Sequence, residues 1–269
     1  MRSMDHQSNR VVALTIAGLD PSGGAGAIAD IRTFVALQCF PTAALTSITF
    51  QNTTGVFGMA HQSVATVRSQ IDVVVQDFPV AAAKTGMLPT VEIVSEVARL
   101  FRETGLPAPV VDPVMVSTTG HSLIAKQATE ALRNELLPVA RIVTPNIPEA
   151  QQLAGISIAN ETDMRRAAEM IQQLGAKAVL VKGGHLSLRS KDAVDILINE
   201  AGEFIEFREQ FVEVGEIHGS GCTLSAAIAA GLAKGLSLEG AVSEAKEFVT
   251  KAIWALRVEP RLGHGAGPL

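Results

Sequence analysis

The stretch VVALTIAGLDPSGGAGAIADIRTFVAL, residues 11–37, decides the fold class of this 269-residue chain. Residues 11–17 are almost continuously apolar, which predicts a strand buried on both faces. A glycine-rich turn follows, and residues 25–37 have the apolar spacing of a helix. A buried strand that passes through a tight turn into a helix is the start of a βαβ unit. The stretch therefore indicates an α/β protein built on a parallel sheet.

The same alternation continues along the chain. Further strands are predicted at 43–50, 80–83, 109–112, 141–143 and 178–181, and further helices at 63–75, 91–102, 125–136 and 161–174. Three short β-like segments then follow at 193–199, 204–207 and 210–214, which favours a small antiparallel edge. Two helices, 222–233 and 238–257, close the chain. We expect one domain over 1–269, with a flexible stretch at 1–9.

Composition excludes several classes of protein. The chain has 22 Lys and Arg against 27 Asp and Glu, a net charge of -5. It therefore lacks the basic surface that nucleic acid or an anionic membrane requires. Aromatic residues make up only 4%, which argues against a nucleic-acid reader that stacks bases. With 47% hydrophobic residues, the chain must bury a large aliphatic core, so a disordered protein is excluded.

The number of cysteines and the length of the apolar runs indicate the cellular compartment of the protein. Cys39 and Cys222 are too few for a disulfide framework and too far apart in sequence for a zinc knuckle. The longest apolar runs fall short of the ~20 residues of a membrane-spanning helix. We therefore expect a cytoplasmic protein without a membrane segment.

Polar and glycine-rich loops follow the predicted strands, where a parallel sheet binds its ligands. In the first loop, 18–26, three glycines allow backbone N–H groups to approach a ligand, although a tight turn alone would also need them. Its spacing matches neither a Walker A loop nor a dinucleotide fingerprint. In the second loop, 51–55, the amide of Gln51 can both donate and accept, which suits the edge of a heterocycle. A simple polar turn is the alternative.

Two further loops carry carboxylates. Asp112 ends one strand, and Asn146 and Glu149 open a helix three residues apart. Oxygen donors of this kind suit Mg²⁺, usually through water. A helix cap, with Asn146 at the N-cap and Glu149 completing a capping box, explains the same pair, and for that pair alone the cap is the better explanation.

The last two loops suit anions. Lys182 follows a strand and can reach phosphate oxygens, although a surface lysine is the alternative. The segment HGSGCTLSAA, residues 218–227, opens an apolar helix with small residues, so that its first N–H groups can converge on one anion. Cys222 lies in the first turn, where the helix dipole is expected to lower the pKa of the thiol. A small-residue cap with an inert cysteine is the alternative.

Together these segments resemble hydroxymethylpyrimidine/phosphomethylpyrimidine kinases of thiamine biosynthesis, in the ribokinase-like superfamily. The segments that carry the resemblance, in family order, are residues 17–26 (AGLDPSGGAG), 51–53 (QNT), 84–87 (KTGM), 112–115 (DPVM), 144–150 (TPNIPEA), 182–185 (KGGH), 218–223 (HGSGCT) and 263–268 (GHGAGP).

The resemblance implies a three-layer α/β/α fold with a mostly parallel sheet and a small antiparallel edge. It implies ATP-dependent phosphorylation of 4-amino-5-hydroxymethyl-2-methylpyrimidine and then of its monophosphate, with Mg²⁺. By position, it assigns Gly18, Asp30 and Gln51 to binding of the pyrimidine. It assigns Asn146, Lys182, Ser220 and Thr223 to the ATP phosphates, and Asp112 and Glu149 to the side of the site that holds the metal. It makes Cys222 the general base, in an anion hole formed with Gly219 and Gly221. The low charge and abundant Ala and Gly suit a homodimer.

One loop departs from the family pattern. Residues 116–121 read VSTTGH, so Thr118 stands where many members carry a cation, and phosphate contacts by this loop are not expected.

Other functions compete with this one. A pyridoxal or pyridoxine kinase would use the same scaffold, and Gln51 favours the aminopyrimidine only mildly. A non-catalytic ligand sensor would have no need for the set Asn146, Glu149, Lys182 and Cys222. A carbohydrate kinase would more often carry Asp in place of Cys222.

Overall fold

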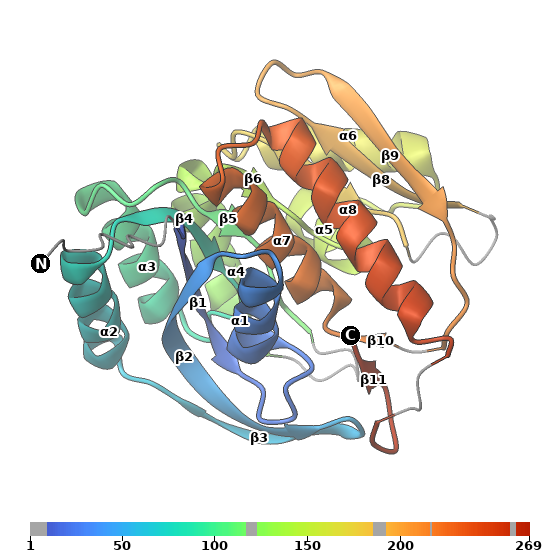
Figure 1. Ribbon diagram of the computed structural model, residues 1–269. Helices are drawn as coiled ribbons and strands as arrows, with labels where there is room; N and C mark the ends of the chain where they lie inside the picture. The colour runs from blue at the N-terminus through green and yellow to red at the C-terminus, as the bar shows by residue number, and fades with distance from the viewer. Residues whose placement is uncertain (1–9, 117–122, 185–191, 216, 259–261) are drawn as a thin grey trace, which may run out of the picture.

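The computed structural model describes residues 10–116, 123–184, 192–215, 217–258 and 262–269. A nine-stranded sheet runs through it in the order β3-β2-β1-β4-β5-β6-β7-β8-β9 (Figure 1). Its strands are β1 (Val12–Leu19), β2 (Phe40–Asn52), β3 (Gly55–His61), β4 (Val80–Thr85), β5 (Val110–Val111), β6 (Ile142–Val143), β7 (Val179–Lys182), β8 (Asp192–Ile198) and β9 (Phe204–Gln210). Strands β2, β1, β4, β5, β6 and β7 pair in parallel. The predicted α/β fold with a mostly parallel sheet is therefore confirmed.

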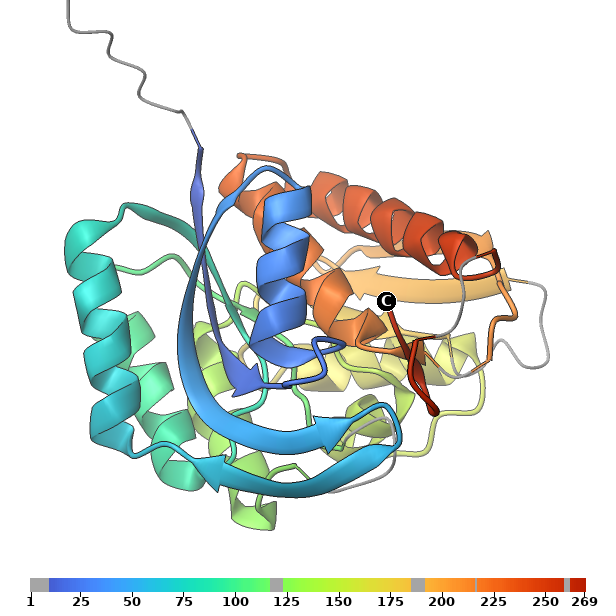
Figure 2. The ribbon, with the colours of Figure 1, turned by 60° about the horizontal axis from the view of Figure 1, so that its bottom comes forward.

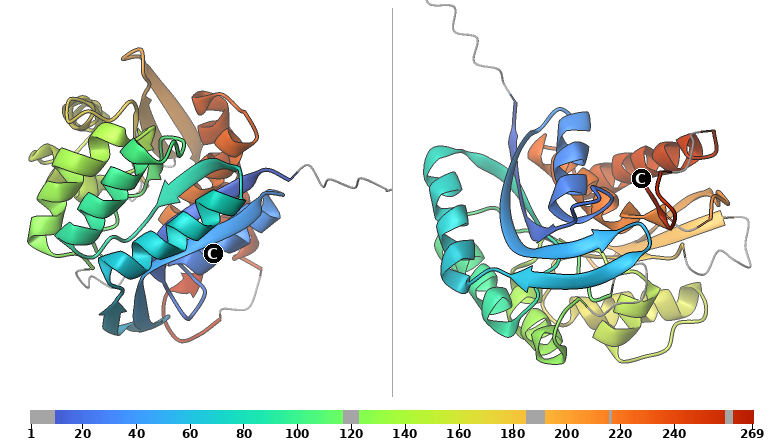
Figure 3. Two further views of the ribbon diagram at one scale, coloured as in Figure 1. Left: turned by 90° about the vertical axis from the view of Figure 1, so that its left-hand side faces the viewer. Right: turned by 90° about the horizontal axis from the view of Figure 1, so that it is seen from below.

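Helices cover both faces of the sheet, as the side view in Figure 3 shows. One face packs against α1 (Gly26–Ala36), α7 (Ser220–Ala233) and α8 (Leu238–Ala255). The other packs against α2 (Val64–Asp77), α3 (Val91–Glu103), α4 (Lys126–Ala131), α5 (Ile147–Ala154) and α6 (Glu161–Gln172). Side chains of β1 alternate between the two layers, since Ala13 belongs to one core and Leu14 and Ile16 to the other. This alternation explains why the strand is apolar on both faces.

Local sequence accounts for several helix starts. The side chains of Ser63, Thr90, Asn160 and Ser237 each accept a backbone hydrogen bond at the N-terminus of α2, α3, α6 and α8 respectively. The predicted helix at 125–136 is shorter than expected. Its α-helical part ends at Ala131, and a π-helical turn (Leu132–Leu136) and a 3₁₀ turn (Leu137–Val139) continue it.

The edges of the sheet differ from the prediction. Strand β3 was not predicted, because GVFGMAH lacks a clear alternation, and it pairs antiparallel with β2. At the other edge, β8 and β9 form the expected antiparallel pair, but the third strand predicted at 210–214 is wrong. After Gln210 the chain leaves the sheet and reaches β10 (Ile217–His218), which pairs with β11 (Gly267–Pro268). Antiparallel strands therefore lie at both edges.

The C-terminal segment reaches the tip of the β2–β3 hairpin (Figure 2). Backbone N–H groups of His264 and Gly265 donate to the Thr53 hydroxyl, and that of Ala266 donates to the Thr53 carbonyl. These contacts bring β10, and with it the start of α7, beside the end of β2. No helix in the described part of the chain is long and apolar enough to cross a membrane.

Candidate active site

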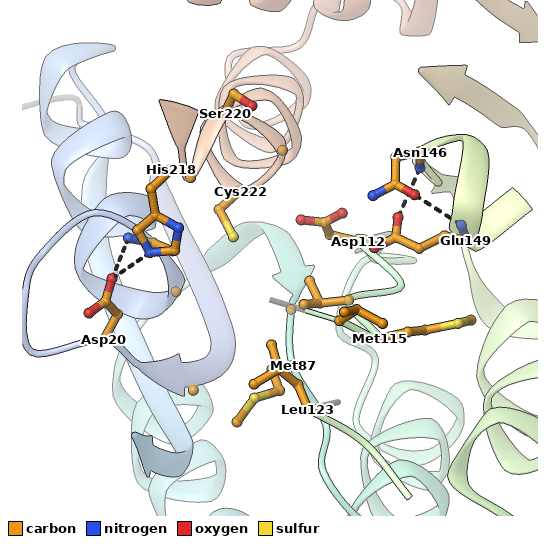
Figure 4. A pocket seen from close by; sticks show the side chains of 18 of the residues that line it. Asp20, Met87, Asp112, Met115, Leu123, Asn146, Glu149, His218, Ser220 and Cys222 are labelled. Atoms are coloured by element: carbon orange, nitrogen blue, oxygen red, sulfur yellow. Dashed lines mark hydrogen bonds and ion pairs between the residues drawn. The ribbon is translucent and has the colours of Figure 1, made fainter. Parts of the chain in front are cut away.

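A pocket of about 400 Å³ lies beyond the carboxyl ends of the parallel strands. Figure 4 shows side chains from several distant segments pointing into it. From β1 the chain passes to β2 and β3 on one side and then returns to β4 on the other side of β1. A switch of this kind leaves a crevice beyond the carboxyl ends of the strands, where parallel sheets bind their ligands. The pocket brings together ten of the residues singled out in the sequence: Gly18, Gln51, Asp112, Asn146, Glu149, Lys182, Gly219, Ser220, Gly221 and Cys222.

Two of the predicted site residues do not line this pocket. Asp30 is fully buried, and its carboxylate accepts hydrogen bonds from Lys84 Nζ and from the Thr15 hydroxyl. Thr223 is also buried, and its backbone N–H donates to the Gly219 carbonyl. The structure therefore gives neither residue direct access to a ligand in the pocket. Thr118 and residues 1–9 lie outside the described residues.

The predicted anion site lies at the N-terminus of α7. Gly219 caps this helix with φ of 86°, a left-handed conformation that glycine adopts without strain. A Cβ on Gly219 would lie 1.7 Å from the Gly24 carbonyl oxygen, so the glycine loop and α7 meet in direct backbone contact. The N–H groups at the first turn of a helix have no intrahelical partner and carry its positive dipole end. The N-terminus of α7 therefore suits an anion in the pocket.

Cys222 lies in this first turn and points into the pocket (Figure 4). Burial raises the pKa of its thiol to about 12, the nearby carboxylates of Asp112 and Asp30 add to the rise, and Lys84 opposes it. The backbone N–H of Gly26, at the start of α1, also favours the thiolate. The expectation that this pKa is lowered is wrong, because desolvation outweighs the favourable effects of Lys84 and the Gly26 N–H. The thiol is therefore mostly protonated at neutral pH.

Asn146 and Glu149 form the capping box of α5. The Asn146 side chain accepts from the Glu149 N–H at 2.9 Å, and Glu149 Oε2 accepts from the Asn146 N–H at 2.8 Å. Burial raises the pKa of Glu149 to about 7, Lys182 opposes the rise, and Asp112 adds to it. The cap fixes the Glu149 carboxylate at the pocket wall, so the structural and the functional interpretations of this pair are compatible.

Asp112 lies between a lysine and a serine. Its Oδ1 is 3.2 Å from Lys182 Nζ, and its Oδ2 accepts from the Ser225 hydroxyl at 3.2 Å. A Cβ on Gly221 would lie 3.1 Å from Lys182 Nζ, which places this ammonium at the start of α7. Lys182 is mostly but not fully buried, which disfavours its charge, but Asp112 and Glu149 raise its pKa and keep it a cation. One cation and two carboxylates thus border the anion site.

The described residues contain no cluster of three or more His, Cys, Asp or Glu able to hold a metal by themselves. Mg²⁺ does not need one, because it is commonly held by one or two carboxylates together with waters and substrate phosphates. Asp112 and Glu149 line one pocket, and they are close enough for the charge of Asp112 to raise the pKa of Glu149. This donor pair fits Mg²⁺.

The opposite side of the pocket contains a polar triad that the sequence reasoning missed. His218 Nε2 lies 2.9 Å from Asp20 Oδ2 and 2.7 Å from the Gln51 amide nitrogen. Burial disfavours the Asp20 carboxylate, but hydrogen bonds from His218 and Ser22 lower its pKa overall, so it is ionised. His218 Nε2 therefore carries a proton and donates to Asp20. The only local signal for this triad was the position of Asp20 and His218 beside glycines in two strand-end loops.

Asp20 also organises the first glycine loop. Its Oδ1 accepts from the Ser22 N–H and hydroxyl, and its Oδ2 accepts from the Ala25 N–H. The loop is thus held against His218 by one carboxylate.

We expect Asp20→Asn to destabilise the protein by about 1.5–3 kcal/mol at pH 7, the range for hydrogen bonds to a charged group. The pKa of Asp20 is lower in the folded state than its ordinary value of 3.8. The charge therefore stabilises the fold above that value, and the contribution is lost as pH falls through the folded pKa. Urea unfolding at pH 7 and at pH 3 should show a large gap between wild type and variant that shrinks in acid. The exposed Asp77→Asn is the control, and an equal gap at both pH values would contradict the assignment.

Comparison with known proteins agrees with this geometry. Residues 20–269 match the family model described as phosphomethylpyrimidine kinase. A hydroxymethylpyrimidine/phosphomethylpyrimidine kinase of Streptomyces coelicolor is 46% identical over 258 residues, which cover 96% of this chain and 93% of that protein. A thiamine biosynthesis bifunctional protein of Geobacter sulfurreducens is 43% identical over 95% of this chain, which spans 51% of that longer protein.

Solved structures are similar too. The crystal structure of a phosphomethylpyrimidine kinase from Clostridium difficile has a TM-score of 0.80 and 42% identity, covering 91% of this chain and 100% of that one. The pyridoxal kinase of Staphylococcus aureus, solved with AMP-PCP and pyridoxal, has a TM-score of 0.86 and 34% identity, covering 97% and 93%.

Proposed function

This chain belongs to the phosphomethylpyrimidine kinase family, and we propose how its pocket carries out the reaction of that family. The enzyme is a hydroxymethylpyrimidine/phosphomethylpyrimidine kinase of thiamine biosynthesis. It transfers a phosphoryl group from ATP to 4-amino-5-hydroxymethyl-2-methylpyrimidine and then a second one to the resulting monophosphate. The sequence prediction of family and reaction is confirmed.

The observation that carries our assignment of roles is the division of the pocket. Lys182 lies with Asp112 and Glu149 near the N-terminus of α7, and the Gln51 amide lies with His218. Figure 4 shows Asp112 and Glu149 on the opposite side of the pocket from His218. Cys222 is in the turn between the two (Figure 4). We assign the charged side to ATP phosphates and the amide side to the pyrimidine.

On the phosphate side, the protein's task is to position charged groups and neutralise developing charge, because phosphoryl transfer needs little covalent chemistry from the enzyme. Lys182 and the first N–H groups of α7, from Ser220 to Cys222, stabilise the charge on the transferring group. Asn146 holds Glu149 in place through the capping box. Asp112 and Glu149 would hold Mg²⁺ through water, and the ion would supply additional positive charge at the phosphates.

On the pyrimidine side, Gln51 pairs with the ring and its amino group, beside the Gly18 loop. The contact of the Gln51 amide nitrogen with His218 Nε2, at 2.7 Å, holds this amide on the pyrimidine side of the pocket. Cys222 accepts the proton of the substrate's primary hydroxyl as general base. Because burial raises the pKa of the thiol, only the thiolate fraction acts as base, and turnover rises with pH.

A coupled assay of ATP consumption tests the assignment with the hydroxymethyl pyrimidine, its monophosphate and pyridoxal measured side by side. We expect both pyrimidines to turn over faster than pyridoxal. Turnover of pyridoxal alone would overturn the substrate assignment. Absence of any turnover with Mg²⁺ and ATP would favour a ligand sensor.

A pyridoxal kinase activity is the second candidate, and the similarity to the Staphylococcus aureus enzyme favours it. Gln51→Leu separates the two. Loss of the amide should raise the KM for the aminopyrimidine by about tenfold or more, as one lost hydrogen bond of about 1.5 kcal/mol implies. The KM for pyridoxal, which lacks the amino group of the pyrimidine, should change less.

We further propose that the enzyme is a cytoplasmic homodimer. The β2–β3 hairpin exposes Ile48, Phe50 and Phe57, and Phe57 is 71% exposed, which is unusual for a large apolar side chain. Both cysteines are free, in keeping with a reducing compartment. Light scattering should give twice the mass of the 28.2 kDa chain, and Phe57→Glu should shift the mass toward that of one chain.

A further inference from the structure

A buried ion pair lies under the pocket, and the mechanism above does not use it. Lys84 Nζ donates to both oxygens of Asp30, at 2.9 and 2.8 Å, and neither side chain is exposed. The Thr15 hydroxyl adds a third hydrogen bond to the same carboxylate at 2.6 Å. Removing two charges from water costs more than their attraction commonly returns, so a pair of this kind is weak evidence for a stabilising role. A functional role is the better explanation.

The pair lies next to Cys222 in the fold. Asp30 is one helical turn after Gly26 in α1, and the Gly26 N–H faces the Cys222 sulfur. Lys84 lies near the end of β4, two residues before Gly86, which lines the pocket. A Cβ on Gly86 would lie 3.0 Å from Lys84 Nζ, so the ammonium is directly beneath the pocket floor.

Charged groups that act on Cys222 come from four other segments of the fold. They are Lys84 from β4, Asp30 from α1, Asp112 after β5 and Lys182 at the end of β7, together with the dipoles of α1 and α7. Burial has the largest effect on the thiol and raises its pKa, Lys84 has the next largest and lowers it, and Asp112 and Asp30 raise it. Of the two members of the ion pair, Lys84 therefore has the stronger effect on the pKa of Cys222, and Asp30 has the weaker one.

We propose that Lys84 and Asp30 are positioning residues that act on the reaction through Cys222. Lys84 supplies a fixed positive charge that favours the thiolate, and Asp30, held by Thr15, fixes Lys84 in place and moderates its effect. Since the pair is out of contact with solvent, salt and water do not screen it as they screen a surface charge. The proposal rests on the proposed function only in that the thiolate serves as base.

The test measures the rate of Cys222 alkylation by iodoacetamide at a fixed pH of about 8.5, followed by peptide mass spectrometry in the absence of substrates. This rate is proportional to the thiolate fraction. Lys84→Met should slow alkylation by about tenfold or more, the effect of one neighbouring charge. Asp30→Asn should accelerate it. The neutral double variant should react more slowly than wild type but no more slowly than Lys84→Met, because Lys84 has the stronger effect on the thiol.

The double variant keeps the proposal testable if a single variant fails to fold, since it leaves no unpaired buried charge. Cys39, whose Sγ faces the Ala230 carbonyl at 3.8 Å, is the internal control, and its alkylation rate should not change. An unchanged rate of Cys222 alkylation in the folded double variant would overturn the proposal, and slower alkylation of Cys222 in Asp30→Asn would remove Asp30 from it. Alkylation needs no catalysis, so the result is independent of whether Cys222 is the base. The pH profile of kcat/KM decides whether Cys222 is the base, and the variants should change this profile in the same order in which they change alkylation.

Discussion

Cys222→Ala is expected to lower kcat by about 10²–10⁴-fold, the contribution of a general base to proton transfer. The side chain lines the pocket in the first turn of α7, between Asp112 on one side and His218 on the other. Its removal leaves Lys182 and the helix N-terminus in place, so the affinity for ATP should change little. A second sign distinguishes the base from a packing residue. Wild-type turnover should rise with pH as the thiolate fraction grows, and the variant should lose this rise.

Cys39→Ala is the matched control for this experiment. Cys39 is the other free cysteine and is buried against α7, where it does not line the pocket. We expect its loss to reduce stability and to leave kcat unchanged. Turnover of Cys222→Ala within a few-fold of wild type, with the pH dependence intact, would remove Cys222 from the chemistry.

Gly219→Ala is expected to lower kcat by about 10²–10³-fold, the cost of losing a preorganised oxyanion-hole donor. The added Cβ would lie 1.7 Å from the Gly24 carbonyl oxygen, far closer than any atoms can approach. Either the glycine loop or the start of α7 must move, and both line the pocket. The N–H groups at the start of α7 would then no longer face the phosphate site. Steady-state kinetics and thermal unfolding measure the two consequences separately.

Gly235→Ala separates backbone strain from this clash. Gly235 has φ of 85°, nearly the same as Gly219, but nothing lies within 4 Å of the position of its Cβ. A left-handed alanine costs roughly 1–2 kcal/mol, so Gly235→Ala should lose stability and keep normal kinetics. If Gly219→Ala behaved in the same way, the contact between α7 and the glycine loop would have no part in catalysis.

Much of the fold was accessible from local patterns. Continuous apolar runs such as residues 11–17 predict buried strands, and seven strand-end motifs in family order led to the reaction. The failures lie where the local pattern is weak. Strand β3 contains two glycines and little alternation, and residues 211–214 leave the sheet because the chain must cross to the pocket and pair β10 with β11.

The site was only partly accessible for a related reason. Residues that line the pocket follow strands directly, and strand ends can be recognised in the sequence. Whether a side chain near such an end faces the pocket depends on the face of the helix or strand it occupies. Asp30 was expected at the pyrimidine, but it lies on the buried side of α1, where Lys84 neutralises it. His218 and Asp20 are 198 residues apart in sequence and meet only because α7 starts against the glycine loop.

Short-range patterns in the sequence were enough to predict the alternation of parallel strands and helices, the family and the chemical types of groups at the strand ends. The charge states depend on the tertiary structure. Cys222 was expected to have a lowered pKa because its position in a helix is a local property. Burial raises the pKa of Cys222 instead, Asp112 and Asp30 add to the rise, and Lys84 only partly offsets it. These three charges come from three other segments of the fold. Desolvation and Coulomb energies depend on distances in space, and only the packed chain defines them.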